Sequence, residues 1–294
     1  MHQAAACYFN RVDIWQSPHT LSLIDLALEE DLGRGDVTSA ATIAAETQIT
    51  ANFVSRQDLV VAGLPVVQMV AARVSPALRL TTQTKDGVAA GKGEILAQLQ
   101  GPARAVLAAE RTALNFLQRL SAVATVTDRF VEAARGGTAR VVDTRKTTPG
   151  YRALEKYAVL CGGGGNHRFD LGSGVLIKDN HIAANGSLTD TVNRARQAAP
   201  HLLKIEVEVD TLAQLEEALT AGADVVLLDN FKTPDIMQAV ARKNAVRPHV
   251  LLEVSGGVTL DRIAELSRTG VDLISVGALT HSAVSVDIGL DFVK

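Results

Sequence analysis

The sequence has few cysteines, few aromatic residues and almost balanced charge, and each shortage excludes a class of protein. Its two cysteines, Cys7 and Cys161, are too few for a disulfide framework and lack the spacing of a metal site. A formal net charge of -3 argues against a general nucleic-acid binder, which carries a basic surface. The longest apolar run, over 59–72, is too short to span a membrane. The first twenty residues contain no apolar segment typical of a signal peptide, so we expect a cytoplasmic protein.

The chain does have enough apolar residues to build a substantial core. Hydrophobic residues make up 47% of the 294 residues while aromatic residues make up 4%, so Val, Leu, Ala and Ile must fill that core. Because the net charge is small, an anionic ligand must be held by a local cluster of cations and not by the field of the whole protein.

The chain up to residue 114 predicts an α+β domain with a mostly antiparallel sheet. Leu23, Ala27 and Leu28 have helical spacing, and glycines follow at 33 and 35, so we expect a helix over 21–32. Further helices are expected over 64–74 and from about residue 105. Short strand-like stretches, separated by Gly and Asp turns, are expected over 49–56, 59–63, 78–84 and 95–99.

The second part, over 115–278, alternates short apolar strands with amphipathic helices. This alternation is typical of a parallel (β/α) barrel or an open parallel sheet. Helices are expected, for example, over 212–221 and 260–269. The six strands that the residues indicate cover 139–142, 174–177, 203–207, 224–228, 250–254 and 273–276.

Polar residues follow these strands one after another. Because ligands bind at the carboxyl ends of parallel strands, we expect the polar side chains to gather at one pole of the domain. The residues that follow the strands in chain order are 143–147, 178–181, Glu206 with Glu208 on the same face, Asp229 with Asn230, 255–257 and 277–278.

The types of side chain at this pole indicate phosphoribosyl chemistry. Arginine binds carboxylates through its planar fork and lysine binds phosphate as a compact charge, so the cations at 145, 146, 167–168 and 178 predict an anion pocket. The glycine turns at 255–257 and 276–278 offer backbone amides to a phosphate. Two acids, Glu208 and Asp229, can hold ribose hydroxyls, bind Mg²⁺ or stabilise a sugar cation.

Each of these features also has an ordinary structural interpretation. Arg145 and Lys146 alone would be a solvated loop pair, and the glycines over 162–165 alone would be a flexible turn. Glu206 and Glu208 could belong to a plain strand edge, and we interpret His181 as a structural loop histidine. The common location of all these groups at one pole favours the functional interpretation.

The stretch DTRKTTPGYRALEKYAVLCGGGGNHRFDLGSGVLIKDNHI, over 143–182, resembles the signature of the quinolinate phosphoribosyltransferase family, also called carboxylating nicotinate-nucleotide pyrophosphorylases. The resemblance covers nearly the whole chain. Further similar segments are LEEDLGRGDVTS at 28–39, ERTALNFLQRLSAVAT at 110–125, EVEVD at 206–210, LLDNF at 227–231, LEVSGG at 252–257 and VGALTHS at 276–282.

The resemblance implies a fold and an assembly. It implies an N-terminal α+β sandwich domain over 1–114, an open (β/α) barrel of about seven parallel strands over 115–278, and a C-terminal segment, 279–294, that returns to the first domain. It also implies a homodimer with shared active sites, in which Arg111 reaches the pocket of the neighbouring subunit; a higher oligomer stays open. The extension over 1–15 has no role that the residues indicate.

The resemblance also implies residue roles. Lys146, Lys178, Glu208 and Asp229 would act in catalysis, with Mg²⁺ held at Glu208 and Asp229 directly or through the donor substrate or water. Thr148 and Tyr151 stand where leucine is common in the family, which leaves only the fine substrate geometry open. The expected substrate-binding residues are Arg111, Thr144, Arg145, Lys146, His167, Arg168, Lys178, Glu208, Asp229, Ser255, Gly256, Gly257, Val276, Gly277, Ala278 and His281.

The implied reaction joins quinolinate to phosphoribosyl pyrophosphate and releases CO2, giving nicotinate mononucleotide for NAD synthesis. One alternative is a sister transferase that uses nicotinate or another base without decarboxylation; the paired cations favour a dianion over a monoacid. A second alternative is a biotin or lipoyl carrier, because Asp86 to Gly101 has the rhythm of such domains, although Lys92 lacks the usual neighbours of a carrier lysine. A third is an inactive regulator with this fold.

Overall fold

The computed structural model describes residues 14–293, which form two compact units. The first unit contains the chain up to Asp128, Thr147–Gly163 and the chain from Leu279 onward. The second contains Arg129–Lys146 and Gly164–Ala278. The boundaries of these units differ from the boundary at residue 115 that we expected from the sequence. Both 115–128 and 147–163 belong to the first unit. Cys7 and most of the extension over 1–15 lie outside the described residues.

The first unit contains a four-stranded antiparallel sheet in the order β12-β1-β5-β3. The last strand in the chain pairs with the first, so the segment after residue 279 belongs to this unit. The stretch from Asp86 to Gly101, considered above as a carrier domain, supplies β4 and most of β5 of the unit's sheets. The strands are β1 Gln48–Ser55, β2 Leu59–Val60, β3 Arg79–Thr82, β4 Ala89–Ala90, β5 Ile95–Pro102 and β12 Ile288–Phe292, with β2 and β4 paired separately.

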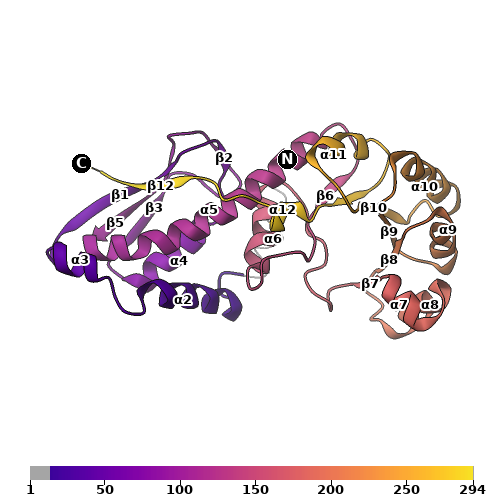
Figure 1. The fold of residues 1–294 in the computed structure, drawn as a ribbon, viewed down its shortest axis with the longest axis horizontal. Coiled ribbons are helices and arrows are strands. Elements are labelled where there is room, and N and C mark those ends of the chain that lie inside the picture. Colours follow the sequence, from indigo (N-terminus) through magenta and orange to yellow (C-terminus); the bar gives the residue numbers. More distant parts are fainter. Residues whose placement is uncertain (1–13, 294) are drawn as a thin grey trace. The chain divides into compact units, whose positions relative to one another are not determined.

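Helices cover one face of this sheet (Figure 1). The side chains buried in this unit are mostly aliphatic, and Phe53 and Phe116 are buried as well. Helix α4 begins where the Asp86 carboxylate accepts hydrogen bonds from the amides of Gly63 and Leu64. The helices are α2 Pro18–Leu32, α3 Val37–Thr42, α4 Leu64–Val74, α5 Ala103–Ala133, whose residues beyond 128 belong to the second unit, and α6 Arg152–Cys161.

The second unit is a parallel sheet of six strands in the order β6-β11-β10-β9-β8-β7. The six-strand interpretation of the residues is confirmed, with each strand within two residues of its expected bounds. Strands such as VVLLD are apolar almost throughout because both faces of a parallel sheet are covered. The strands are β6 Arg140–Val142, β7 Val175–Ile177, β8 Ile205–Val209, β9 Val225–Asp229, β10 Leu251–Ser255 and β11 Leu273–Ser275.

The barrel of the second unit is open. Strand β6 pairs with β11 on one side, and on the other side a single parallel bridge joins Val142 to Gly165. This bridge stands where a seventh strand would pair, and the glycines over 162–165 therefore lead into it. Among the residues that the structure describes, strand β7 pairs only with β8 and forms the free edge of the sheet.

Helices surround the outside of this sheet (Figure 1). Helix α9 shows how the sequence defines their ends: Thr211 and Gln214 form a capping box at its start, and Gly222 ends it in a left-handed conformation. The helices are α7 Asp179–Asn185, α8 Leu188–Ala198, α9 Leu212–Ala221, α10 Thr233–Val246, α11 Leu260–Leu266 and α12 Ala278–His281, the last at the boundary with the first unit.

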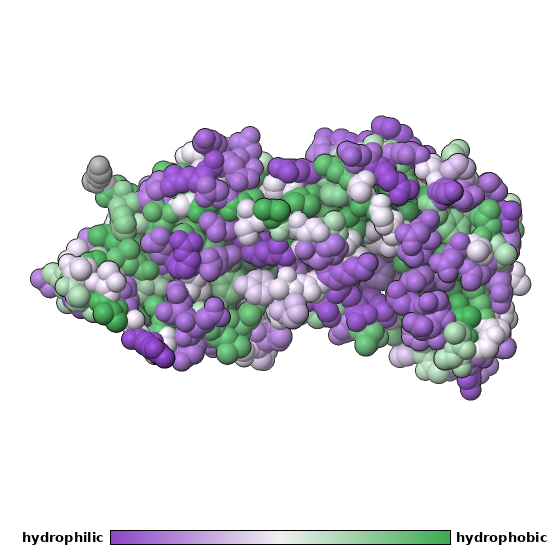
Figure 2. All heavy atoms as spheres, in the orientation of Figure 1, coloured by the Kyte–Doolittle hydropathy of each residue, from purple (hydrophilic) through white to green (hydrophobic). Residues whose placement is uncertain are grey.

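In the part of the chain that the structure describes, no helix combines the length and the apolarity that crossing a membrane requires. In the view of Figure 2, hydrophilic residues cover much of the surface and hydrophobic residues lie between them in small groups.

Candidate active site

A cleft of about 420 Å³ lies at the carboxyl ends of the parallel strands in the second unit. It brings together residues that are far apart in sequence, as expected for this pole of the sheet. Among the residues predicted from the sequence, the cleft is lined by Thr144, Arg145, Lys146, His167, Arg168, Lys178, Glu208, Asp229 and Ser255. Leu176, Leu227, Glu253 and Ser275 line it as well, and the sequence analysis did not identify them.

A buried carboxylate, Asp143, fixes the two loops that carry most of the cations. Its Oδ1 accepts a hydrogen bond from the His167 amide at 2.9 Å, and its Oδ2 accepts one from Asn166 Nδ2 at 2.6 Å. Because Asp143 directly follows β6 and is 0% exposed, it joins the loop after β6 to the loop before β7. Arg145 and Arg168 therefore extend from loops with a common anchor.

The two arginines of the cleft lie close enough to influence each other. Burial lowers the pKa of the Arg168 guanidinium, and the positive charge of Arg145 lowers it further. Arg168 Nη1 donates a hydrogen bond to the Gly174 carbonyl oxygen at 2.9 Å, which directs the side chain along the loop. Two neighbouring guanidinium groups create a site that favours an anion with more than one negative charge.

Lys178 and Glu208 form an ion pair from neighbouring strands. Lys178 Nζ lies 2.6 Å from Glu208 Oε2 and remains 44% exposed. The Lys178 amide donates to His181 Nδ1 at 3.0 Å, a contact that supports the structural interpretation of that histidine. The lysine and the carboxylate thus stand together at the ends of β7 and β8, where a substrate or a cation can contact both.

The ends of β9 and β10 interlock. Asn230 adopts a left-handed conformation, with φ of 56°, and its Nδ2 donates to Asp229 Oδ2 at 2.7 Å. The backbone amide of Asn230 donates a hydrogen bond to the Ser255 carbonyl oxygen at 3.0 Å. A Cβ atom at Gly256 would lie 2.1 Å from Asn230 Oδ1, so only glycine fits there. This interlock orients the Asp229 carboxylate beside the turn at 255–257.

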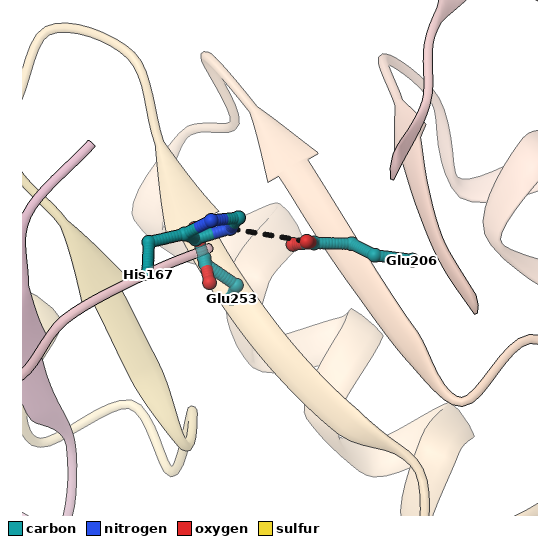
Figure 3. A group of neighbouring side chains, drawn as sticks. All are labelled: His167, Glu206 and Glu253. Atoms are coloured by element: carbon teal, nitrogen blue, oxygen red, sulfur yellow. Dashed lines mark ion pairs between the residues drawn. The ribbon is translucent and has the colours of Figure 1, made fainter. Parts of the chain in front are cut away.

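Part of the cleft lining belongs to a cluster of His167, which is half-buried, with the buried Glu206 and Glu253, shown in Figure 3. His167 Nε2 is 3.0 Å from Glu206 Oε2 and 3.6 Å from Glu253 Oε1. Burial, together with the nearby Glu206 carboxylate, raises the pKa of Glu253 to about 7. The signal for Glu253 in the sequence is a single charge inside the apolar strand LLEVS, on the same strand face as Ser255.

Several predicted residues lie elsewhere than on the lining of this cleft. Gly256, Gly257, Val276, Gly277 and Ala278 adjoin the strands that end at it without being among its lining residues. His281 belongs to the first unit, where its Nδ1 lies 2.7 Å from Ser282 Oγ.

Arg111 also belongs to the first unit and lines a different cleft, of about 260 Å³. That cleft includes the acids Glu30 and Asp31 and the ring of Tyr151, which stacks on Phe116 at 5.6 Å. Arg111 is exposed on the surface of α5.

Thr148 and Tyr151, the two positions expected from the sequence to differ from the family, have partners in the first unit. Thr148 Oγ1 donates to Glu155 Oε1 at 2.9 Å, and its amide donates to Glu155 Oε2 at 3.0 Å. Arg119 binds the same buried carboxylate. A threonine thus fits here because a carboxylate inside the unit accepts its hydroxyl.

Comparison with known proteins identifies one family over both units. The family described as quinolinate phosphoribosyl transferase, N-terminal domain, matches residues 36–121, and the corresponding C-terminal domain matches residues 123–291. The chain is 47% identical over 268 residues to the nicotinate-nucleotide pyrophosphorylase (carboxylating) of Mycobacterium leprae, covering 90% of this chain and 94% of the relative. It is 45% identical over 262 residues to a probable enzyme of the same name from Bacillus subtilis, covering 89% of each. The solved nicotinate-nucleotide pyrophosphorylase of Francisella tularensis has a TM-score of 0.88 at 36% identity and covers 95% of this chain and 99% of its own.

Proposed function

The chain belongs to the quinolinate phosphoribosyltransferase family, and on that premise we propose that its cleft converts quinolinate and phosphoribosyl pyrophosphate into nicotinate mononucleotide, pyrophosphate and CO2. The observation that carries the proposal is the composition of the cleft. Four cationic side chains line it together with two carboxylates at strand ends: Arg145, Lys146, Arg168 and Lys178 with Glu208 and Asp229.

The cations suit the two adjacent carboxylates of quinolinate. Arg145 and Arg168 offer planar guanidinium groups that can bind carboxylate oxygens in pairs. An opposite charge at about 4 Å attracts by roughly 4 kcal/mol near a protein surface, so several such contacts offset the repulsion between two anionic substrates, less the desolvation that they require. A monoacid such as nicotinate would leave part of this positive charge uncompensated, which disfavours the sister transferase.

The two carboxylates suit the ribose side of the donor and Mg²⁺. In proteins, Mg²⁺ prefers oxygen ligands from one or two carboxylates, together with substrate phosphates and water. Glu208 and Asp229 both line the cleft and offer such carboxylates. When bound there, Mg²⁺ would neutralise negative charge on the pyrophosphate. The glycine turns at 255–257 and 276–278 are proposed to hold the phosphates through backbone amides.

The chemical steps follow from these positions. The C1–oxygen bond of the donor breaks and its electron pair leaves with pyrophosphate, while Glu208 and Asp229 stabilise the positive charge that develops on the ribose. The pyridine nitrogen forms the new bond to C1 and becomes cationic. The C2–carboxylate bond then breaks, CO2 departs, and the electron pair stays on C2, where it accepts a proton. Lys146 and Lys178 line the cleft and can supply that proton.

We also propose a homodimer whose active sites are shared. The free edge of β7 carries an open groove of about 780 Å³ with an apolar lining that includes Leu171, Val175 and Leu203, and Leu171 is 72% exposed. A second copy of the chain that covers this edge would remove that apolar surface from water. Arg111, exposed in the first unit, would then complete the cleft of the partner. With two cysteines and no disulfide pattern, the cytoplasm is the proposed location.

The proposal is tested by following the carboxyl carbon. Quinolinate labelled in its C2 carboxylate should release labelled CO2 only with phosphoribosyl pyrophosphate and Mg²⁺, in an amount equal to the nicotinate mononucleotide formed. Arg145→Gln should lower this rate about a hundredfold or more, because it removes a cation from the cleft. The matched control Arg247→Gln, at an exposed arginine in the loop before β10, should not. Equal or faster turnover of nicotinate would refute the decarboxylating assignment.

A further inference from the structure

The imidazole of His167 is held on both sides by groups of the protein. The Arg168 amide donates a hydrogen bond to His167 Nδ1 at 2.8 Å. On the other side of the ring, Nε2 lies 3.0 Å from Glu206 Oε2, and the ring is only 14% exposed. Both ring nitrogens are therefore engaged inside the second unit.

The direction of these contacts defines the protonation of the ring. A backbone N–H can only donate, so Nδ1 must carry a lone pair and no proton. Nε2 then carries the proton and donates it to the Glu206 carboxylate. Turning the ring over would place carbon atoms against both the amide and the carboxylate, so the observed orientation is the one that satisfies both partners.

The same argument excludes the ring as a neutral metal ligand. The ligand atoms of His167, Glu206 and Glu253 lie within 4.8 Å of one another, a spacing at which three such groups can hold a metal ion. A neutral imidazole that binds a metal through Nε2 must carry its proton on Nδ1, where it would face the N–H of the Arg168 amide, which can only donate. The hydrogen bond from the Arg168 amide therefore favours a proton at Nε2 over a metal ion.

We infer that His167 is a positioning residue, held as the neutral Nε2–H tautomer between the Arg168 amide and the Glu206 carboxylate, and that it fixes Arg168 instead of pairing with the carboxylates of the substrate. The inference rests on the proposed function and deepens it. The sequence analysis placed His167 among the cations that receive quinolinate. In this geometry the arginines and lysines of the cleft, and not His167, supply the positive charge that binds the substrate carboxylates.

The surroundings of the ring support this role. Asp143 holds the His167 amide, Glu206 holds Nε2, and the Arg168 amide is held by Nδ1, so the short segment 166–168 is fastened at three points. Arg168 directs its guanidinium from this segment to the Gly174 carbonyl. Glu253, whose side chain is 1% exposed, lies beside the ring with its Oε1 at 3.6 Å from Nε2.

Nitrogen NMR tests the tautomer directly. The full chain, labelled with ¹⁵N in its histidine rings, should show for residue 167 one protonated nitrogen, Nε2, and one unprotonated nitrogen, Nδ1. The signal is assigned by its absence from the His167→Gln protein. An imidazolium, an Nδ1–H tautomer, or loss of the Nε2–H signal when one equivalent of Zn²⁺ is added would each overturn the inference. This readout does not depend on turnover, so it stays decisive even if the proposed reaction is not observed.

Kinetics of three variants test the positioning role. Asn keeps an acceptor near the place of Nδ1, Gln keeps a donor near the place of Nε2, and neither side chain can carry positive charge. His167→Ala should raise KM for quinolinate about tenfold or more, with a smaller change in kcat and an unchanged KM for phosphoribosyl pyrophosphate. His167→Asn or His167→Gln should recover at least part of that loss, and the exposed control His249→Asn should behave as the wild type. Equal impairment of all three variants at residue 167 would mean that the positive charge of the ring matters, and the inference would fail.

Discussion

Replacing Glu253 by glutamine should make the stability of the protein less sensitive to pH. Glu253 has an unfolded pKa of 4.5 and a folded pKa of about 7. Between these two values the folded protein holds a proton that the unfolded chain has released, so unfolding releases a proton and stability falls as pH rises. Below pH 4.5 both states are protonated and above pH 7 both are ionised, so the effect is confined to that window.

The structure gives the size of this effect. The difference between the two pKa values corresponds to about 3 kcal/mol, since each pKa unit is about 1.4 kcal/mol. No discount for solvent is needed because the side chain is 1% exposed. Glutamine has nearly the same shape and no charge to lose, so Glu253→Gln should gain about 2 to 3 kcal/mol relative to wild type between about pH 5 and pH 8.

Thermal unfolding measured over this pH range is the appropriate assay. For a domain of this size the gain corresponds to a Tm difference, variant minus wild type, that grows by about 5 to 10 °C from pH 5 to pH 8. The matched control Glu265→Gln, at an exposed glutamate of α11, should show a constant difference. A Tm difference that does not change with pH for Glu253→Gln would refute the claim that burial beside Glu206 keeps this carboxyl protonated.

Two further predictions concern the cleft and its assembly. Lys178→Ala should lower turnover about a hundredfold or more while Tm changes by only a few degrees, because the 44% exposed side chain pairs with Glu208 and does not fill the core. Turnover and thermal unfolding of the variant are measured together. A variant that unfolds would show that Lys178 has a structural role. Arg111→Ala and Lys178→Ala homodimers should both be nearly inactive, but a random mixture of the two subunits should recover about a quarter of wild-type activity, because about half of the dimers would be hybrids with one intact site. No recovery despite demonstrated subunit exchange would place Arg111 outside the partner's site.

The sequence predicted the parallel sheet and most of the cleft for a simple physical reason. In alternating β/α sequences, the residue after each apolar strand lies at the same edge of the sheet, so Lys178, Glu208 and Asp229 could be placed together without coordinates. The resemblance added Arg111 and His281, and their role in a shared site stays a prediction.

What the sequence did not reveal depends on contacts between distant segments. In the sequence, Glu253 is a single charge in an apolar strand. Its raised pKa and its place in the cluster depend on Glu206, two strands away, and on the imidazole of His167 in the loop before β7. Strands β4 and β12 were not predicted from the sequence, and their pairing with β2 and β1 defines them. The division between units was also hidden, because helix α5 continues through it and the segment 147–163 joins the first unit through Glu155 and Arg119.

The interlock of Asn230 with Gly256 has a consequence for how this sequence can change over evolution. A side chain at position 256 would collide with the Asn230 amide and with Asp229 Oδ1, at 2.1 and 2.9 Å from the new Cβ atom. The φ of Gly256, 82°, is also one that residues with a side chain rarely adopt, so a smaller residue at 230 would relieve the collision but not this strain. Position 256 should therefore stay glycine in natural or engineered variants of this chain, whatever residue stands at 230.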